Sequence, residues 1–417
     1  MTDNSTPIAT DSLLENDRRN VPGKRSTLIT FIGVVLVLFV LLAIAFYFVH
    51  THFKYTMNNR YCKKRVIGFY EDEGSSEMRH THFDKLTHIV FSHKFLIENG
   101  TIAFKNKDAR FRFDNLKDIA KLYWNGMKVM ISIGGDMQFS AVMASQSKRS
   151  KLADSIVTFL DEHKTDGVDL FWKWPAASDK TSYLLFVKEL RQKMLKRDKK
   201  YILSVTSAPA GIPGYWPDGF DLEEMINHVD FMNIFSMDFY GPWGWQTGPA
   251  APLYHGIAPR ENFTVDYTMN YYTCKLKETS KLNIVIPMDA RIWRNVKTTL
   301  PGSEVFRRAD LVGGKVEGTI YTSRLVAENA GINFAPSNWD EQTKSSYIFD
   351  QKSGIFLTFE NKKSIEEKLN YVNEKNLGGV WIRSVNMDDG SVHLLDDINY
   401  QEYCSSRSTD TVNYQCV

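Results

Sequence analysis

The stretch Asp166-Gly-Val-Asp-Leu-Phe-Trp-Lys-Trp-Pro175 is a short apolar strand with an acidic residue at its centre. Side chains alternate along a strand, so Asp169, Phe171 and Lys173 share one face, and the residues between them share the other. An Asp inside an apolar parallel strand is expected to face a polar interior. In a barrel of parallel strands the active site forms at the carboxyl ends of the strands, so we expect functional side chains near Lys173.

Further strands of the same kind flank this one. From Arg65 onward, short β-branched runs alternate with helical patterns, which indicates βα units and a parallel sheet. Eight such units predict an α/β fold, a (β/α)8 TIM barrel. The predicted strands are Val66–Tyr70, His88–Ser92, Lys128–Ile133, Gly167–Trp172, Ile202–Ser207, Phe231–Ser236, Asn283–Pro287 and Gly379–Ser384.

The helical pattern between these strands can be checked at two places. Leu152, Ile156 and Leu160 recur at i, i+4 and i+8, which predicts an amphipathic helix. Ser364 followed by Glu367 matches a capping box, which predicts a helix start before the eighth strand.

The gap between the seventh and eighth strands is too long for one crossover helix. It contains turn-separated runs, so we predict a small α+β insertion domain at about residues 294–358. The barrel with this insertion covers residues 61–403, and residues 404–417 form a C-terminal tail.

The N-terminal part has a different character. Residues 28–49 form an uncharged apolar run that, as a helix, is about 33 Å long and matches a bilayer core of about 30 Å. We predict a transmembrane signal anchor, a disordered cytoplasmic tail at residues 1–26 and a stalk at residues 50–60. The alternative is a cleaved signal peptide, for which Ala43 and Ala45 keep cleavage possible.

Basic residues flank the apolar run on both sides and do not decide its orientation. Two glycosylation sequons, at Asn99 and Asn262, lie after the run. All the cysteines also follow it, and their even number fits a disulfide-forming compartment with three possible pairings. These signals favour a single-pass type II membrane protein with a lumenal or extracellular barrel. The disulfide candidates are Cys62, Cys274, Cys404 and Cys416.

Charge and ligand spacing exclude some functions. The chain has 51 Lys and Arg against 49 Asp and Glu, a net charge of +2, which gives no reason to expect a nucleic-acid partner. His93 has no second His or Cys at metal-ligand spacing, so neither a metal site nor a cofactor is predicted.

Four motifs in order resemble glycoside hydrolase family 18, and its nematode chitinase-like members most closely. The family's fourth strand reads DGxDxDxE, which the stretch from Asp166 to Lys173 follows in part. Ser132-Ile-Gly-Gly135 resembles the family's SxGG motif, the segment from Asn233 to Asp238 resembles its sixth-strand segment, and Gly378-Gly379 opens the eighth strand. The resemblance covers about residues 61–400, and it implies a chitinase-type barrel.

In that family, hydrolysis is substrate-assisted: the last Glu of the motif protonates the glycosidic oxygen, and an Asp two residues earlier positions the acetamide of the sugar. This sequence has Lys173 at the acid position and Phe171 at the helper position. An ammonium of ordinary pKa is a poor acid, and Phe171 cannot orient an amide. Asp166 and Asp169 remain, and we interpret them as structural, with Asp169 pairing Lys173.

Other positions that the resemblance assigns to sugar binding have also changed. Met237 replaces the sixth-strand Tyr, although Asp238 is kept, and Asp289 replaces the seventh-strand Tyr, although Arg291 is kept. Arg383 replaces the eighth-strand Trp that floors the central sugar site.

Cleft aromatics of the first three strands align with Glu73, His93 and Asp136. Trp243 matches a cleft Trp of the family, whereas Trp245 has no counterpart, and packing within their loop is an equal alternative for both.

Three functions follow from these observations. The first is a membrane-anchored, catalytically inactive chitinase-like protein that binds an N-acetylglucosamine-containing glycan or a protein. The second is an active hydrolase with a relocated acid, such as Glu73, Asp136 or Asp289. The third is a structural or interaction protein without a sugar ligand, favoured if charges such as Lys173 and Arg383 pair across the mouth.

Overall fold

The computed structural model describes residues 24–61, 64–72, 80–92, 95–122, 126–135, 137–209, 218–335 and 337–398, and residues 403, 412, 414 and 416. The chain divides into two compact units, Met1–Arg60 and Tyr61–Val417. Most of the expected cytoplasmic tail lies outside the described residues.

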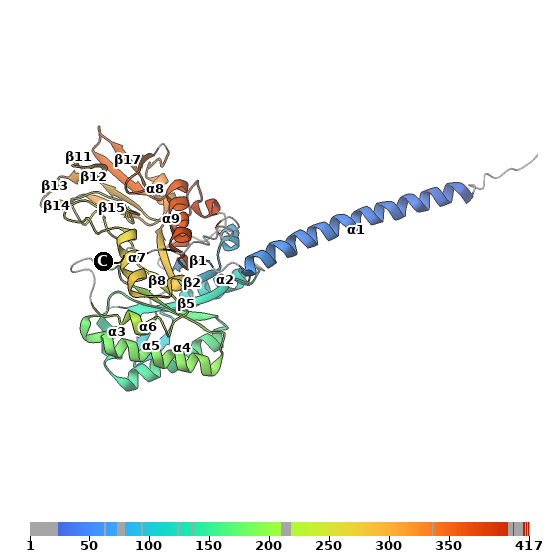
Figure 1. Cartoon of the computed structure of the whole chain (residues 1–417), viewed down its shortest axis with the longest axis horizontal. Helices are drawn as coiled ribbons and strands as arrows, with labels where there is room; N and C mark the ends of the chain where they lie inside the picture. Colours follow the sequence, from blue (N-terminus) through green and yellow to red (C-terminus); the bar gives the residue numbers. More distant parts are fainter. Residues whose placement is uncertain are drawn as a thin grey trace, which may run out of the picture. The chain divides into compact units, whose positions relative to one another are not determined.

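The first unit holds one long helix, α1 (Lys24–Tyr61) (Figure 1). Its segment Phe31–Val49 has a mean hydropathy of 3.1, and none of that segment is buried. A helix of this length that is apolar on all sides has the length and composition to cross a membrane. The helix continues through residues 50–60, the expected stalk.

The second unit is built on a barrel of parallel strands (Figure 1). Among the described residues, eight strands close in the order β1-β19-β9-β8-β7-β6-β5-β2. All eight predicted strands are present; β8 ends two residues earlier than expected and β5 continues two residues further. The strands are β1 (Arg65–Glu71), β2 (His88–Ser92), β5 (Lys128–Gly135), β6 (Gly167–Trp172), β7 (Ile202–Ser207), β8 (Phe231–Ile234), β9 (Leu282–Pro287) and β19 (Gly379–Arg383).

Helices connect these strands and bury one apolar face each. In α4, the predicted face of Leu152, Ile156 and Leu160 is buried. The helices are α2 (Lys107–Leu122), α3 (Met137–Met143), α4 (Gln146–His163), α5 (Lys180–Arg197), α6 (Leu222–Met225), α7 (Val265–Lys275) and α9 (Lys362–Glu374). Short 3-10 turns are η1 (His80–Lys85), η2 (Ala177–Asp179), η3 (Thr279–Lys281), η4 (Val385–Met387) and η5 (Leu394–Asp397).

The start of α9 differs from the predicted one. The N-cap is Asn361, whose side chain accepts from the Ser364 backbone N–H at 3.0 Å, while the Ser364 hydroxyl accepts from the Asn361 N–H at 2.9 Å. Ser364 is therefore the third helical residue. The prediction that Ser364 is the N-cap of a capping box with Glu367 was wrong by one helical turn. Asn and Ser both cap well, so the pattern alone did not separate them.

The insertion between β9 and β19 forms its own sheet. The described part of this lobe holds a five-stranded sheet in the order β15-β10-β18-β17-β16, with a small core around Ile292 and Leu357. Its first strand begins at Ala290, ahead of the expected boundary, because the chain turns out of the barrel directly after β9. The sheet strands are β10 (Ala290–Trp293), β15 (Gly318–Tyr321), β16 (Asn338–Asp340), β17 (Ser345–Asp350) and β18 (Ile355–Phe359).

Smaller elements complete the second unit. The helix α8 (Arg324–Asn329) follows β15. Among the residues that the structure describes, three hairpins are β3 (Leu96–Glu98) with β4 (Thr101–Ala103), β11 (Val296–Leu300) with β12 (Ser303–Ala309), and β13 (Leu311–Val312) with β14 (Lys315–Val316).

A disulfide joins Cys274, near the end of α7, to Cys416, with a Cα–Cα distance of 5.4 Å. Tyr414 donates a hydrogen bond to the carbonyl of Lys375 at 2.8 Å, so the C-terminal segment is attached to the barrel at two points. The other two disulfide candidates, Cys62 and Cys404, lie outside the described residues.

Candidate functional site at the barrel mouth

Asp169 lies inside the barrel and is fully buried. Its carboxylate accepts hydrogen bonds from Ser204 Oγ at 2.6 Å, Thr206 Oγ1 at 2.8 Å and Asn233 Nδ2 at 3.1 Å. Burial raises the pKa of Asp169 to about 6, and these hydrogen bonds oppose that rise. The residue therefore ties together three neighbouring strands, and the expected pairing of Asp169 with Lys173 was wrong.

Asp166 directly precedes β6, at the end of that strand away from the mouth. Its carboxylate accepts from Lys128 Nζ at 2.9 Å and from the Val129 backbone N–H at 2.9 Å. These contacts join the starts of β5 and β6.

Lys173 follows the last residue of β6, and its partner comes from the segment after β8. Its Nζ lies 3.3 Å from Asp238 Oδ2 and 4.5 Å from the centre of the Phe235 ring. Burial lowers the pKa of Lys173, and Asp238 opposes that shift. The pairing differs from the expected one because Asp169 is surrounded by donors inside the barrel, whereas Lys173 extends out at the mouth.

Asp238 also belongs to a second ion pair, with Arg291 of β10. Arg291 Nη2 lies 2.6 Å from Asp238 Oδ1 and 3.0 Å from Asp289 Oδ2, and only 1% of its side chain is exposed. Its Nη1 donates to the carbonyl of Tyr240. The mouth therefore contains a continuous charged chain from Lys173 through Asp238 and Arg291 to Asp289.

The pKa values of the two carboxyl groups in this series of ion pairs, Asp238 and Asp289, are shifted in opposite directions. Burial acts to raise the pKa of Asp238, but Arg291, Lys173 and Arg383 outweigh it and hold the pKa below its usual value. Burial raises the pKa of Asp289, with Arg291 opposing. The surroundings of Asp238 thus favour its charged form, whereas burial makes Asp289 easier to protonate than an ordinary Asp.

Aromatic rings fill the floor beside these charges. The Phe171 ring centre lies 5.9 Å from Phe235, 6.1 Å from Trp174 and 6.4 Å from Trp381. Arg383 lies with its guanidinium carbon 5.2 Å from the centre of the Phe235 ring. Phe171 and Arg383 thus stand at two positions for which the family resemblance implied contacts with the sugar.

Arg383 is also held by Glu71, at the end of β1. Arg383 Nε donates to Glu71 Oε1 at 2.8 Å, and both side chains are about a quarter exposed, 25% and 28%. Glu71 was missed by the sequence reasoning, although its position at the carboxyl end of a predicted strand was a usable signal. Met237 is buried and takes no part in these polar contacts.

Trp243 and Trp245 lie on the rim and are 50% and 44% exposed. The guanidinium of Arg291 lies 5.3 Å from the centre of the Trp243 ring. A Cβ at Gly241 would lie 2.1 Å from that ring, so this position accepts only glycine while the ring is folded back. The tryptophan is therefore anchored on one face and open to solvent elsewhere.

A cavity of about 580 Å³ opens beside the end of β6, and sequence reasoning did not predict it. Lys173, Trp174 and Asp179 line it, together with small side chains of α3. Ser140 Oγ donates to Asp179 Oδ1 at 2.7 Å on its wall. The remaining expected cleft residues, Glu73, His93 and Asp136, lie outside the described residues.

Comparison with known proteins shows which family this chain resembles along most of its length. The model of the family described as Glycosyl hydrolases family 18 matches residues 65–388. The chain is 25% identical over 348 residues to the oviduct-specific glycoprotein of Mus musculus, an alignment of 77% of this chain and 47% of that protein. It therefore spans about half the length of that relative.

Two further proteins are similar to this chain. It is 25% identical over 323 residues to chitinase-3-like protein 2 of Homo sapiens, covering 73% of this chain and 80% of that protein. A solved structure described as YKL-39 in the presence of chitooligosaccharides (GlcNAc4) superimposes with a TM-score of 0.68 at 19% identity, over 81% of this chain and 99% of the other. At this identity, the similarity to that structure shows a shared fold alone.

Proposed function

The chain belongs to glycosyl hydrolase family 18, and on that premise we propose that it is a membrane-anchored, chitinase-like protein that binds a ligand at the barrel mouth without hydrolysing it. The Lys173–Asp238 ion pair carries this proposal, because it occupies the place from which a proton would have to be delivered.

A general acid must hold a proton at the working pH and give it to the leaving oxygen. The ordinary pKa of a lysine is about 10.4, which makes its ammonium a poor donor. Burial lowers the pKa of Lys173, but the Asp238 carboxylate favours the charged form and accepts from the ammonium at 3.3 Å. The proton is therefore directed toward a carboxylate of the protein.

The second requirement of family chemistry is a polar group that orients the acetamide of the substrate. Phe171 stands at that position, and its neighbours are the rings of Phe235 and Trp381. An aromatic ring offers no hydrogen-bond acceptor of comparable strength, so the acetamide would not be held for attack. On this proposal, neither the protonation of the leaving oxygen nor the orientation of the acetamide has a suitable side chain.

We propose a ligand that lies across the rim, on Trp243 and Trp245, and an N-acetylglucosamine-containing glycan is its first candidate. Sugars stack their apolar faces on aromatic rings, and both rings are about half exposed. A related fold described with chitooligosaccharides supports this ligand class. A protein ligand is the alternative, supported by the charges at the mouth, which pair with one another.

An active hydrolase with a relocated acid is the second candidate function. Asp289 favours it, because burial raises the pKa of that carboxyl toward the range of a general acid. Its Oδ2, however, accepts two hydrogen bonds from Arg291, at 3.0 and 3.1 Å, which favours the charged form. We therefore rank this function below the non-hydrolytic one.

The test uses the full-length protein in detergent, with binding of N-acetylglucosamine oligomers measured by calorimetry and turnover followed in the same samples. We expect saturable binding without product, and a loss of at least about tenfold in affinity for Trp243→Ala, since stacked rings contribute strongly to such contacts. Trp339→Ala, on β16 of the insertion lobe, is the matched control and should bind normally.

Other outcomes discriminate between the candidates. Product formation would overturn the non-hydrolytic proposal. An absence of binding at millimolar oligomer, with a folded protein, would reject the glycan and favour a protein ligand at the mouth.

A further inference from the structure

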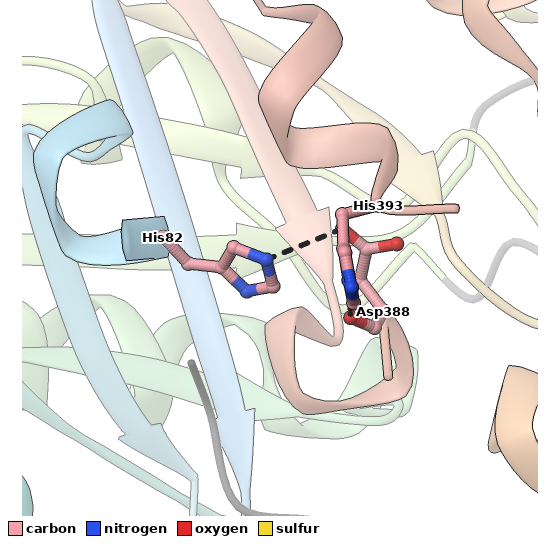
Figure 2. Close-up of side chains that lie close together, drawn as sticks. All are labelled: His82, Asp388 and His393. Atoms are coloured by element: carbon pink, nitrogen blue, oxygen red, sulfur yellow. Dashed lines mark hydrogen bonds and ion pairs between the residues drawn. The ribbon is translucent and has the colours of Figure 1, made fainter. Parts of the chain in front are cut away.

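Three metal-ligating side chains meet outside the barrel mouth, near the junction of the first and last strands. His82 comes from η1, Asp388 follows η4, and His393 precedes η5 (Figure 2). One ligand atom from each side chain lies within 4.8 Å of the others. His82 and Asp388 are buried and His393 is half-buried, so the group has one side toward solvent.

The carboxylate of Asp388 is held in place by backbone groups. The N–H of Leu394 donates to Oδ1 at 2.9 Å, and the N–H of Leu395 donates to Oδ2 at 2.9 Å. His82 Nε2 lies 3.9 Å from the same Oδ2, which is longer than a hydrogen bond (Figure 2). The backbone thus holds the carboxylate toward His82 and leaves lone pairs on both oxygens.

His393 is oriented by the same loop. Its Nδ1 lies 3.0 Å from the backbone carbonyl of Asp388. A carbonyl only accepts, so Nδ1 carries the proton in this contact, and the lone pair of the neutral ring lies on Nε2. Metal-binding histidines commonly donate their second ring N–H to a carbonyl or carboxylate in this way.

We propose that His82, Asp388 and His393 bind one divalent transition-metal ion of the zinc class, which clips η1 to the segment after β19. Two imidazole nitrogens and one carboxylate oxygen are a donor set that suits zinc. Tetrahedral zinc places neighbouring ligand atoms about 3.4 Å apart, so the present 3.9 Å between His82 and Asp388 requires a contraction of about half an ångström. Water from the exposed side supplies the fourth ligand.

The surrounding charge is compatible with a bound cation. Arg324 and Lys368 are buried cations of this region: Arg324 interacts with the carboxylates of Asp388, Glu360 and Glu328, and Lys368 pairs with Glu360 at 2.6 Å. Three carboxylates thus face two cations, so the local charge does not oppose a divalent ion.

The three side chains lie beside the paired strands β1 and β19, so an ion bound there would stabilise the fold. The strand β1 pairs with β19, in a register that runs from Arg65 opposite Gly379 to Phe69 opposite Arg383, and this pair closes the barrel. An ion that binds the folded chain but not the unfolded one stabilises the fold by mass action. We therefore expect saturating Zn²⁺ to raise the melting temperature of the protein.

The test uses the full-length protein in detergent, purified without a polyhistidine tag and stripped with a chelator. Titration with Zn²⁺, and with Co²⁺ followed by its visible absorption, should show one tight site per chain. His393→Gln removes a ligand and should weaken binding by at least about 100-fold, because even a residue that only supports a ligand contributes about 10- to 100-fold to metal affinity. His393→Cys, which keeps a zinc ligand, should restore binding.

His228→Gln is the matched control, because His228 is also half-buried and lies before β8, away from the cluster. Mg²⁺ and Ca²⁺ should neither bind tightly nor raise the melting temperature, since both prefer oxygen ligands. His393 is chosen over Asp388, whose removal would also free two backbone N–H groups and could unfold the chain. An absence of saturable Zn²⁺ binding, or binding that His393→Gln leaves unchanged, would overturn the proposal.

Discussion

The Lys173 ammonium lies 3.3 Å from the Asp238 carboxylate, and this carboxylate in turn lies 2.6 Å from Arg291. One carboxylate is thus shared between a half-exposed cation that follows β6 and a buried cation of the insertion lobe. On the function that we propose, the residue at the family's proton-donor position is part of a series of ion pairs that links the insertion lobe to the barrel.

The two cations that share Asp238 should contribute differently to stability. Arg291→Met leaves Asp238 and Asp289 without their buried partner and should lower the free energy of unfolding by about 3–5 kcal/mol. Lys173→Met removes a pair whose lysine is 45% exposed, so the loss should be under about 1 kcal/mol. Urea unfolding of both variants measures the difference, and equal losses would argue against the charge chain.

Restoring the acid alone should not restore hydrolysis. Lys173→Glu places a carboxyl at the acid position, but it faces Asp238 and stands beside Phe171, which cannot hold an acetamide. We expect no release of product from a chromogenic chitooligosaccharide, and a lower melting temperature through like-charge repulsion. Lys196→Glu, at an exposed position of the outer helix α5, is a control for the charge change. Turnover by Lys173→Glu alone would show that Phe171 does not block the reaction.

Asp169 should make stability depend on pH. Its pKa in the folded chain is about 6 against an ordinary 3.8, so between about pH 4 and pH 6 the folded state holds a proton that the unfolded state has released. The free energy of unfolding therefore falls as the pH rises through this window, by on the order of 3 kcal/mol from this group. Asp169→Asn should flatten that part of the profile, as measured by urea unfolding between pH 4 and pH 7. An unchanged profile would contradict the role given to burial.

The sequence allowed the barrel to be predicted because each strand carries its own local signal. The run Gly167–Trp172, for example, is apolar apart from Asp169 and lies between polar segments. The partner of Lys173 could not be predicted in this way, since Asp238 lies 65 residues away, in the segment that follows β8. His82 and Asp388 meet for the same reason, through the closure of the barrel, and no spacing in the sequence indicates it.

The disulfide between Cys274 and Cys416 should stabilise the folded chain strongly. It closes a loop with a sequence separation of 142, and constraining so long a loop in the unfolded state contributes about 3–5 kcal/mol. Cys274→Ser and Cys416→Ser should each lower the melting temperature by the same amount, and the double variant by no more. Peptide mapping without reduction checks the bond directly, and additive losses would mean that each cysteine acts separately.

The topology that we infer, with the barrel outside the cytoplasm, predicts glycans on the barrel. Asn99 and Asn262 are exposed, so both sequons are accessible on the folded surface. In eukaryotic cells, Asn99→Gln and Asn262→Gln should each increase the mobility of the protein on a gel by one glycan, and glycosidase treatment should abolish the difference. An epitope tag before residue 28 should remain on the mature protein if α1 stays as the anchor. Loss of that tag would indicate a cleaved signal peptide, and an unglycosylated, membrane-bound barrel would reverse the orientation.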